Sequence, residues 1–229
     1  MARWLAKLDA DAEDLGDFTR WFPRGEIFAE ANADGVFLVG SGLDVHEDVG
    51  QVKAVAEQAL DEFFGVISLL SKATKRPRLG GIFHEDDEGV RREHIFLRAS
   101  ILVRLRSHVK GGDTGPTQAQ LLLAGSKTNA SLGNALQLWS DPNRTWPRLY
   151  RILEEIETYV GVRVHKAHMC TAAQRERFTR SANVAEVAGK DARHAAGKFE
   201  PPAVPMTVRE ATSFISSLLQ AALRKAAGY

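Results

Sequence analysis

The spacing of hydrophobic residues predicts strands and helices in alternation over the first hundred residues. Residues 2–9 (ARWLAKLD) have the pattern of a short strand. Residues 47–73 place apolar side chains every three to four positions over about six turns, which is the repeat of an amphipathic helix. Between these segments a shorter helix is predicted, capped by Asp9 or Asp11 and ended by Pro23 and Gly25. Its apolar face consists of Leu15, Phe18, Trp21 and Phe22.

Two hairpins complete this half of the chain. Residues 26–40 form two β-rich runs around the turn sequence NADG. Residues 79–109 form another pair around DDEG, and Ile101, Val103 and Leu105 alternate with neighbours on the second strand. The order β-α-β-β-α-β-β predicts an antiparallel sheet with its helices on one face.

Helical patterns dominate after the turn-rich segment KGGDTGP (110–116). Thr117, Thr171 and Thr207 each stand three residues before Gln or Glu, the spacing of a capping box. The longest strand-like segment is VGVRVH (160–165). The predicted fold class is therefore α+β. An antiparallel-sheet domain with two helices spans residues 1–110, and a helical bundle spans residues 117–229.

Composition is that of a globular protein, with 44% hydrophobic and 26% charged residues. The net charge is only +1, but residues 141–229 contain 14 Lys and Arg against 9 Asp and Glu, a net charge of +5. Residues 1–140 therefore carry −4, so the C-terminal part is the better place to expect an anion. A single cysteine, Cys170, excludes an intrachain disulfide.

No segment resembles a signal peptide, and no apolar run approaches the roughly 18 residues of a membrane span. We expect a soluble, bacterial-type cytoplasmic protein with no membrane partner. P-loop, dinucleotide-binding and hydrolase-elbow motifs are absent from the sequence, so those enzyme classes have no support. No cofactor is predicted.

Two clusters of chemically competent residues have simpler interpretations. His165, His168 and Cys170 are zinc-binding residue types, but on a strand His165 and His168 would face opposite sides, and no second ligand motif accompanies them. No metal site is therefore predicted. The acidic turn HEDDEG (84–89) is expected to be solvated. Arg98, Arg104 and Arg106, with TKRPR (74–78), could form a basic strip for nucleic acid or a solvated face.

The strongest candidate site lies at residues 183–194. Arg193 offers fixed donors for phosphate or carboxylate, and His194 can exchange a proton near neutral pH. Together they could stabilise an anionic transition state, as metal-independent RNA cleavage requires. Asn183, Lys190 and Asp191 are predicted to bind the ligand or orient the imidazole. The alternative is that these residues cap helix ends, with Gly189 and Gly197 as helix stops.

The chain resembles a bacterial protein family without an assigned function. The similarity is carried by RWLAKLDADAEDL, GVFLVGSGLD, WPRLYRILEEIETYVG and the tail FTRSANVAEVAGKDARHAA…PPAVPMTVREATSFISSLL. In the tail, Asn183, Gly189, Arg193, His194 and the prolines 201, 202 and 205 come in a fixed order.

A weaker resemblance is to HEPN domains, helical bundles that include dimeric, metal-independent ribonucleases. Their signature is an Arg and a His four to six residues apart on a helix. Arg193 and His194 are adjacent, whereas Arg163 and His168 have the spacing but lie in a segment predicted to be non-helical. The resemblance implies RNA as substrate or ligand.

The expected function is binding without a known catalytic class, with RNA or a protein as partner and a homo-oligomer as the assembly. The alternative is a HEPN-like ribonuclease or RNA-binding protein that uses Arg193 and His194.

Overall fold

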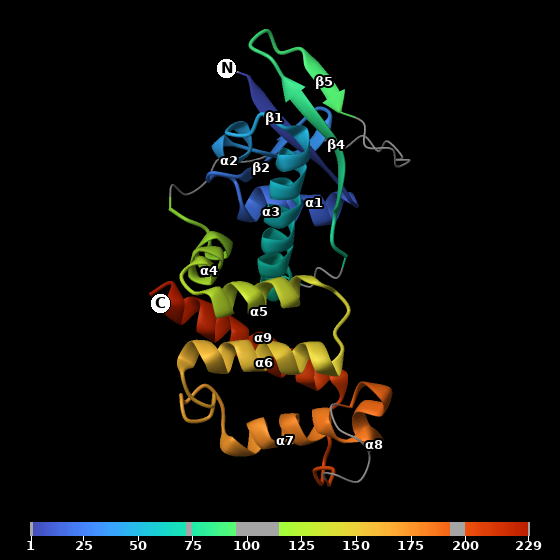
Figure 1. Cartoon of the computed structure of the whole chain (residues 1–229), viewed down its shortest axis with the longest axis vertical. Helices are drawn as coiled ribbons and strands as arrows, with labels where there is room; N and C mark the ends of the chain where they lie inside the picture. Colours follow the sequence, from blue (N-terminus) through green and yellow to red (C-terminus); the bar gives the residue numbers. More distant parts are fainter. Residues whose placement is uncertain (1, 72–74, 95–114, 193–199, 229) are drawn as a thin grey trace. The chain divides into compact units, whose positions relative to one another are not determined.

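The computed structural model describes residues 2–71, 75–94, 115–192 and 200–228. The chain divides into two compact units, Met1–Gln120 and Leu121–Tyr229. The N-terminal half contains a five-stranded antiparallel sheet and the C-terminal half is mostly helical, which confirms the predicted α+β class (Figure 1). Residues 110–114 of the predicted domain boundary lie outside the described residues.

The first unit follows the predicted order of strands and helices, with one extra short helix, α2. Both predicted hairpins are present, although residues 95–109 of the second hairpin lie outside the described part of the chain. The elements are β1 (Arg3–Asp9), α1 (Ala12–Trp21), β2 (Phe28–Asn32), β3 (Gly35–Val39), α2 (Ser41–Asp44), α3 (Val49–Leu70), β4 (Arg78–Glu85) and β5 (Arg91–His94).

The strand order in the sheet is β2-β3-β1-β4-β5, and every neighbouring pair is antiparallel. This order places β3 between β1 and β2, and β1 between β3 and β4. Helices α1 and α3 therefore each connect two parallel strands across an intervening one, which is the split β-α-β arrangement. As a result, the first strand of the chain lies in the centre of the sheet.

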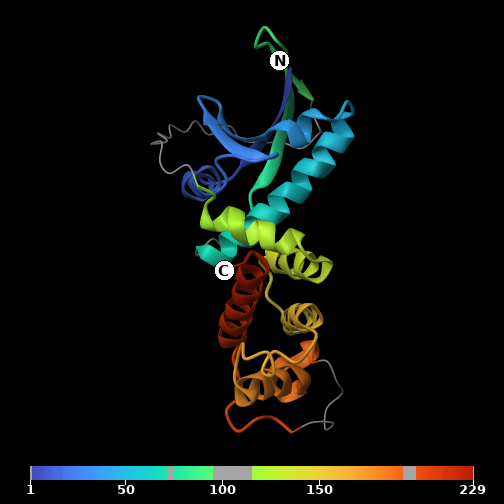
Figure 2. The same cartoon turned by 90° about the vertical axis from the view of Figure 1, so that its left-hand side faces the viewer.

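Helices α1 and α3 pack together beside the sheet. The ring of Phe22, just after α1, stacks on Phe63 of α3 with 3.9 Å between centroids. Figures 1 and 2 show α3 running alongside the strands, and it contacts both β1 and β4. Asp48 caps α3 by accepting a hydrogen bond from the backbone N–H of Gln51. By contrast, Asp11 stands at the start of α1 but its carboxylate makes no capping bond.

Neighbouring residues on β1 point to opposite faces of the sheet, so the strand contributes side chains to both. The side chain of Leu5 belongs to a small core on one of these faces. Leu5 pairs with Phe83 across β1 and β4. This cluster contains Leu5, Phe37 and Val39, all buried, with Phe28 and Phe83 packed against them.

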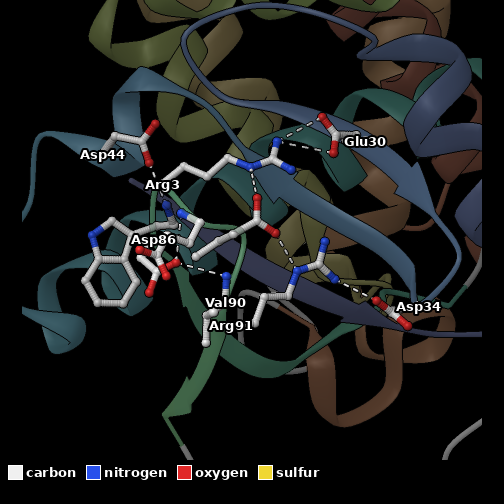
Figure 3. Close-up of polar contacts among 10 residues, drawn as sticks. Arg3, Glu30, Asp34, Asp44, Asp86, Val90 and Arg91 are labelled. Carbon is white, nitrogen blue, oxygen red and sulfur yellow. Dashed lines mark hydrogen bonds and ion pairs between the residues drawn. The ribbon is translucent and has the colours of Figure 1, made fainter. Parts of the chain in front are cut away.

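A network of ion pairs crosses this face of the sheet (Figure 3). Glu85 accepts hydrogen bonds from Arg3 at 2.9 Å and from Arg91 at 2.6 Å, and the two guanidinium groups lower the pKa of its carboxyl. Arg91 also binds Asp34 at 2.6 Å, and Arg3 binds Glu30 at 3.3 Å. Since Arg91 is on edge strand β5 and Asp34 is in the turn after the opposite edge strand, the sheet is strongly curled.

The second unit is a helical bundle, as predicted. Helix α4 (Gln118–Lys127) crosses the boundary between the units in sequence. The capping boxes predicted at Thr171 and Thr207 are both formed, and Thr117 and Gln120 exchange the same two bonds. The remaining elements are α5 (Ala130–Ser140), α6 (Trp146–Val160), α7 (Ala172–Asn183), α8 (Ala185–Ala188), the 3₁₀ helix η1 (Gly189–Asp191) and α9 (Val208–Ala226).

Helix α6 is central to this bundle, since it contacts α5, α7 and α9. Its apolar stripe, Leu149, Ile152, Leu153 and Ile156, is fully buried, as is that of α9 from Ile215 to Leu223. The predicted end of α6 is also observed: Gly161 adopts the left-handed conformation (φ 74°), and its N–H donates to the carbonyl of Glu157.

Candidate functional site

The residues predicted to form the site at 183–194 are only partly described. Arg193 and His194 lie outside the described residues, so their proposed role stays a prediction. Asn183 is the last residue of α7, and its side-chain Oδ1 is buried with no hydrogen-bond partner in the described part of the chain. Lys190 and Asp191 lie in η1, where Lys190 is exposed and Asp191 is half-buried.

The segment between α6 and α7, residues 161–171, is the most distinctive loop of the second unit. Its sequence suggested a strand over residues 160–165, and this prediction is wrong. The segment folds into consecutive turns instead, because backbone N–H groups bond locally: Lys166 and Ala167 donate to Arg163, and His168 donates to His165. The left-handed conformation of Gly161 turns the backbone at the first residue of the loop, so residues 160–165 do not continue as a strand.

One carboxylate anchors this loop to the bundle. Glu157 on α6 accepts two hydrogen bonds from Arg175 on α7, at 2.6 and 3.0 Å, and a third from the backbone N–H of Val164 at 3.1 Å. The side chain of Val164 is fully buried beside it. Burial opposes ionisation of Glu157, but these donors outweigh it and lower the pKa of the carboxyl. The loop is therefore held by both an apolar and an ionic contact.

Backbone strain marks the middle of the loop. His168 is the one residue other than glycine with positive φ in the described part of the chain, at 58°. A non-glycine residue in the left-handed region costs about 1–2 kcal/mol, and such positions are concentrated at functional sites. The imidazole of His168 is exposed. Nearby in sequence, the Nδ1 atom of His165 is buried without a hydrogen-bond partner among the described residues.

Two cations of the loop stand at the rim of an open hollow of about 690 Å³. Arg163 and Lys166 are exposed, and neither forms an ion pair or side-chain hydrogen bond within the described ranges. Arg151 on α6 lines the same hollow and pairs with Glu155 at 2.9 Å. Glu157 also lines it, but its oxygens are taken by Arg175 and Val164. Glu154 lines it as well and lies 3.8 Å from Arg151, so the lining charges without an ion pair in the described part of the chain are those of Arg163 and Lys166.

The zinc-type residues of this loop are not gathered into a site. Within residues 2–71, 75–94, 115–192 and 200–228, no group of three His, Cys, Asp or Glu side chains could hold a metal ion. This includes His165, His168 and Cys170.

The other candidate residues of the first unit have structural roles where they are described. In the acidic turn, Asp86 accepts hydrogen bonds from the backbone N–H groups of Glu88 and Val90, and so shapes the hairpin (Figure 3). In the TKRPR segment, Arg76 is paired with Glu57 and Asp61 of α3. The strand arginines 98, 104 and 106 lie outside the described residues.

Sequence reasoning missed the rim formed by Arg163 and Lys166, although it noticed the spacing of Arg163 and His168. The two cations are three residues apart, which on a strand would place them on opposite faces. Only the turns of the loop bring them to one hollow. The usable signal was Gly161 after a strong helix, followed by four basic or His residues within six positions.

Comparison of the chain with protein-family models, with curated proteins and with solved structures found no match. Across the described residues, none of the helices combines the length and hydrophobicity that crossing a membrane requires.

Proposed function

We propose that this protein binds single-stranded RNA through the basic rim, which we define as Arg163 and Lys166. The observation that carries the proposal is the exposure of Arg163 and Lys166 beside an open hollow, where neither side chain forms an ion pair within the described residues and Glu157 acts on Arg163 only at longer range. The nearby carboxylates pair with other cations: Glu154 and Glu155 with Arg151, and Glu157 with Arg175.

The chemistry of the rim suits phosphate esters. A guanidinium such as that of Arg163 can donate two parallel hydrogen bonds to one phosphate, and Lys166 adds a point charge. The exposed imidazole of His168 provides a flat surface on which an unpaired base can stack, as aromatic side chains do in single-strand binding sites. A duplex would hide its bases, so the single strand is the better fit.

Two features of the sequence support this ligand. Residues 141–229, which include the rim, have a net charge of +5, whereas the rest of the chain is acidic. The resemblance to HEPN domains also implies RNA. Because Arg163 and His168 lie on turns rather than on a helix, their arrangement differs from the HEPN nuclease signature, and we propose binding without cleavage at this site.

Fluorescence anisotropy with a short labelled single-stranded RNA tests the proposal. The double variant Arg163→Ala/Lys166→Ala should weaken binding about tenfold or more at moderate salt. The matched control is Arg224→Ala/Lys225→Ala, which removes the same charge from exposed positions at the end of α9. Equal losses in both variants would show that only net charge matters, and undetectable binding by the wild type at low salt would refute the proposal.

The same samples separate RNA binding from the HEPN-like ribonuclease alternative. RNA incubated with the protein in the presence of a metal chelator should remain intact on a denaturing gel. Cleavage that His194→Ala abolishes without lowering the melting temperature would instead support a ribonuclease using Arg193 and His194. Light scattering on these samples gives the oligomeric state and hence the binding stoichiometry.

A further inference from the structure

A second hollow in the helical unit is lined by three sulfur-containing residues. This pocket, about 360 Å³ in volume, is lined by Met169, Cys170 and Met206 together with residues of α7 and α9. The whole sequence contains one cysteine and three methionines. Every sulfur-bearing residue except Met1 therefore lines one pocket, although Cys170 and Met206 are 36 positions apart in the chain.

Two well-fixed segments bring these residues together. Met169 and Cys170 directly precede the capping box of α7, and Met206 directly precedes that of α9. Met206 is buried, and its backbone N–H donates to the hydroxyl of the buried Ser181 at 2.9 Å. Arg177 holds the chain just before it, by donating to the carbonyls of Val204 and Pro205. The sulfur-bearing segments are thus positioned by both caps and side chains.

The polar groups around the pocket already have partners. Gln174 is used in its capping box, and Glu210 accepts from Arg177 at 3.0 Å and from the backbone N–H of Thr207 at 2.8 Å. The Ser217 hydroxyl donates to a backbone carbonyl one turn earlier on α9. The oxygen atoms of Gln174, Glu210 and Ser217 are therefore used within the protein, and the lining also includes the exposed hydroxyl of Ser213. The thioethers of Met169 and Met206 and the thiol of Cys170 are the soft donors among the residues that line the pocket.

The thiol of Cys170 is half-buried in this pocket. Burial raises its pKa, and this effect exceeds the opposite influence of Arg175. A protonated, half-buried thiol is a poor nucleophile, which does not favour a catalytic role for this cysteine. It can still bind a metal ion that displaces the proton, because metal–thiolate bonds form at the expense of the S–H bond.

We propose that Met169, Cys170 and Met206 bind one Cu(I) ion. Thiolate and thioether sulfurs are soft ligands that exclude Mg²⁺; thiolate binds both Cu(I) and Zn²⁺, and the two neutral thioethers favour Cu(I). Binding replaces the proton of the Cys170 thiol by the metal: Cys–SH and Cu⁺ give Cys–S–Cu and H⁺, with no change of oxidation state. Phe214 and Leu218 provide apolar walls that limit the access of water to the ion. The site uses no residue of the basic rim.

Anaerobic titration of the full chain with Cu(I), in competition with a colorimetric Cu(I) chelator, tests the proposal. The wild type should retain one equivalent and release one proton at neutral pH. Cys170→Ser should weaken binding by about a hundredfold, and Met169→Leu and Met206→Leu by about tenfold each. Leucine keeps the volume of methionine, so these variants are expected to fold. His168→Ala removes a neighbouring ligand type as a matched control and should bind like the wild type.

Several results would overturn the site. Full affinity in both methionine variants would reduce it to an adventitious thiol, and a loss in His168→Ala would indicate an imidazole site. Displacement of Cu(I) by equimolar Zn²⁺ would exclude a soft donor set. X-ray absorption on the wild-type complex needs no variant: the proposal requires a shell of sulfur atoms only, and a shell of nitrogen or oxygen would contradict it.

Discussion

Glu157 concentrates three hydrogen bonds on one side chain, so single substitutions around it should have large effects. Arg175→Ala removes two of these bonds and leaves the mostly buried carboxylate poorly paired. We expect the free energy of unfolding to fall by about 1–3 kcal/mol, measured by urea denaturation. Arg180→Ala, which breaks a more exposed pair with Glu176 on the same helix, should cost less than about 0.5 kcal/mol. Equal costs would contradict the anchoring role of Glu157.

The same carboxylate gives a pH dependence of definite sign. The pKa of Glu157 is lowered in the folded protein, so folding favours its ionised form. Its contribution to stability is fully present above the ordinary value of 4.5 and is lost as pH falls through the folded value. The difference in unfolding free energy between wild type and Glu157→Gln should be largest near neutrality and shrink below about pH 4.5. A difference independent of pH would show that Glu157 is not preferentially ionised in the fold.

The conformation of His168 should lower the stability of the protein, while its imidazole contributes to RNA binding. Glycine adopts the left-handed conformation without the steric cost of a Cβ atom. His168→Gly should therefore raise the free energy of unfolding by about 0.5–1 kcal/mol, which thermal denaturation detects as a higher melting temperature. The same substitution removes the proposed stacking surface and should weaken RNA binding. His165→Gly is the matched control, because His165 has no positive φ and should only lose stability. A loss of stability in His168→Gly would contradict a steric cost of the left-handed conformation at this residue.

At the scale of elements, two helical glycines in the second unit differ in the space around them. A Cβ atom added to Gly125 of α4 would overlap the backbone carbonyl oxygen of Leu223 on α9, whereas one at Gly133 of α5 would make an ordinary contact at 3.5 Å. Gly125→Ala should therefore destabilise the bundle by about 1–3 kcal/mol. Gly133→Ala should be neutral or stabilising by up to about 1 kcal/mol, since alanine favours helix. Thermal denaturation compares the two, and similar melting temperatures would exclude close packing of α4 on α9.

Local patterns predicted most of these elements. The 3.6-residue repeat identified α3, α6 and α9, and the Thr-x-x-Gln/Glu spacing located three helix starts, because both signals depend on residues within one or two turns. The loop after α6 was wrongly predicted as extended. Its conformation depends on Glu157 and Arg175, which belong to different helices, so no short window of sequence contains the cause.

At the scale of the whole molecule, the uneven charge distribution makes RNA binding sensitive to salt. Two phosphate contacts, through Arg163 and Lys166, should contribute a slope of about −1.4 to a plot of log affinity against log salt concentration for a single strand. Arg163→Ala/Lys166→Ala should flatten the slope by that amount. The Arg224→Ala/Lys225→Ala control should leave the slope unchanged. Slopes that change equally would mean that the RNA contacts the surface without using the hollow.

The sites show the limit of sequence reasoning more clearly than the fold does. The α+β class follows from the change from mixed strand and helix patterns to helical patterns near residue 116, which the spacing of apolar and turn residues reveals. The pocket lined by Met169, Cys170 and Met206 cannot be predicted from such a pattern, because only the packing of α7 against the start of α9 brings those positions together. Polar residues that are neighbours in sequence, such as Lys190 and Asp191, are the easiest to predict as a site. Their proximity in the chain does not show which side chains share one surface of the folded protein.

The central position of β1 also has a consequence for synthesis. Strand β1 precedes both of its partners in the chain, so it can pair only when β3 and then β4 have been synthesised, and Arg3 meets Glu85 across 82 positions. Until then the nascent chain displays Trp4, Leu5 and Ala6 with no strand beside them. A chain truncated before β4 would therefore expose this apolar strand, and a ribosome-associated chaperone should crosslink to Leu5 in stalled chains of that length but not in longer ones.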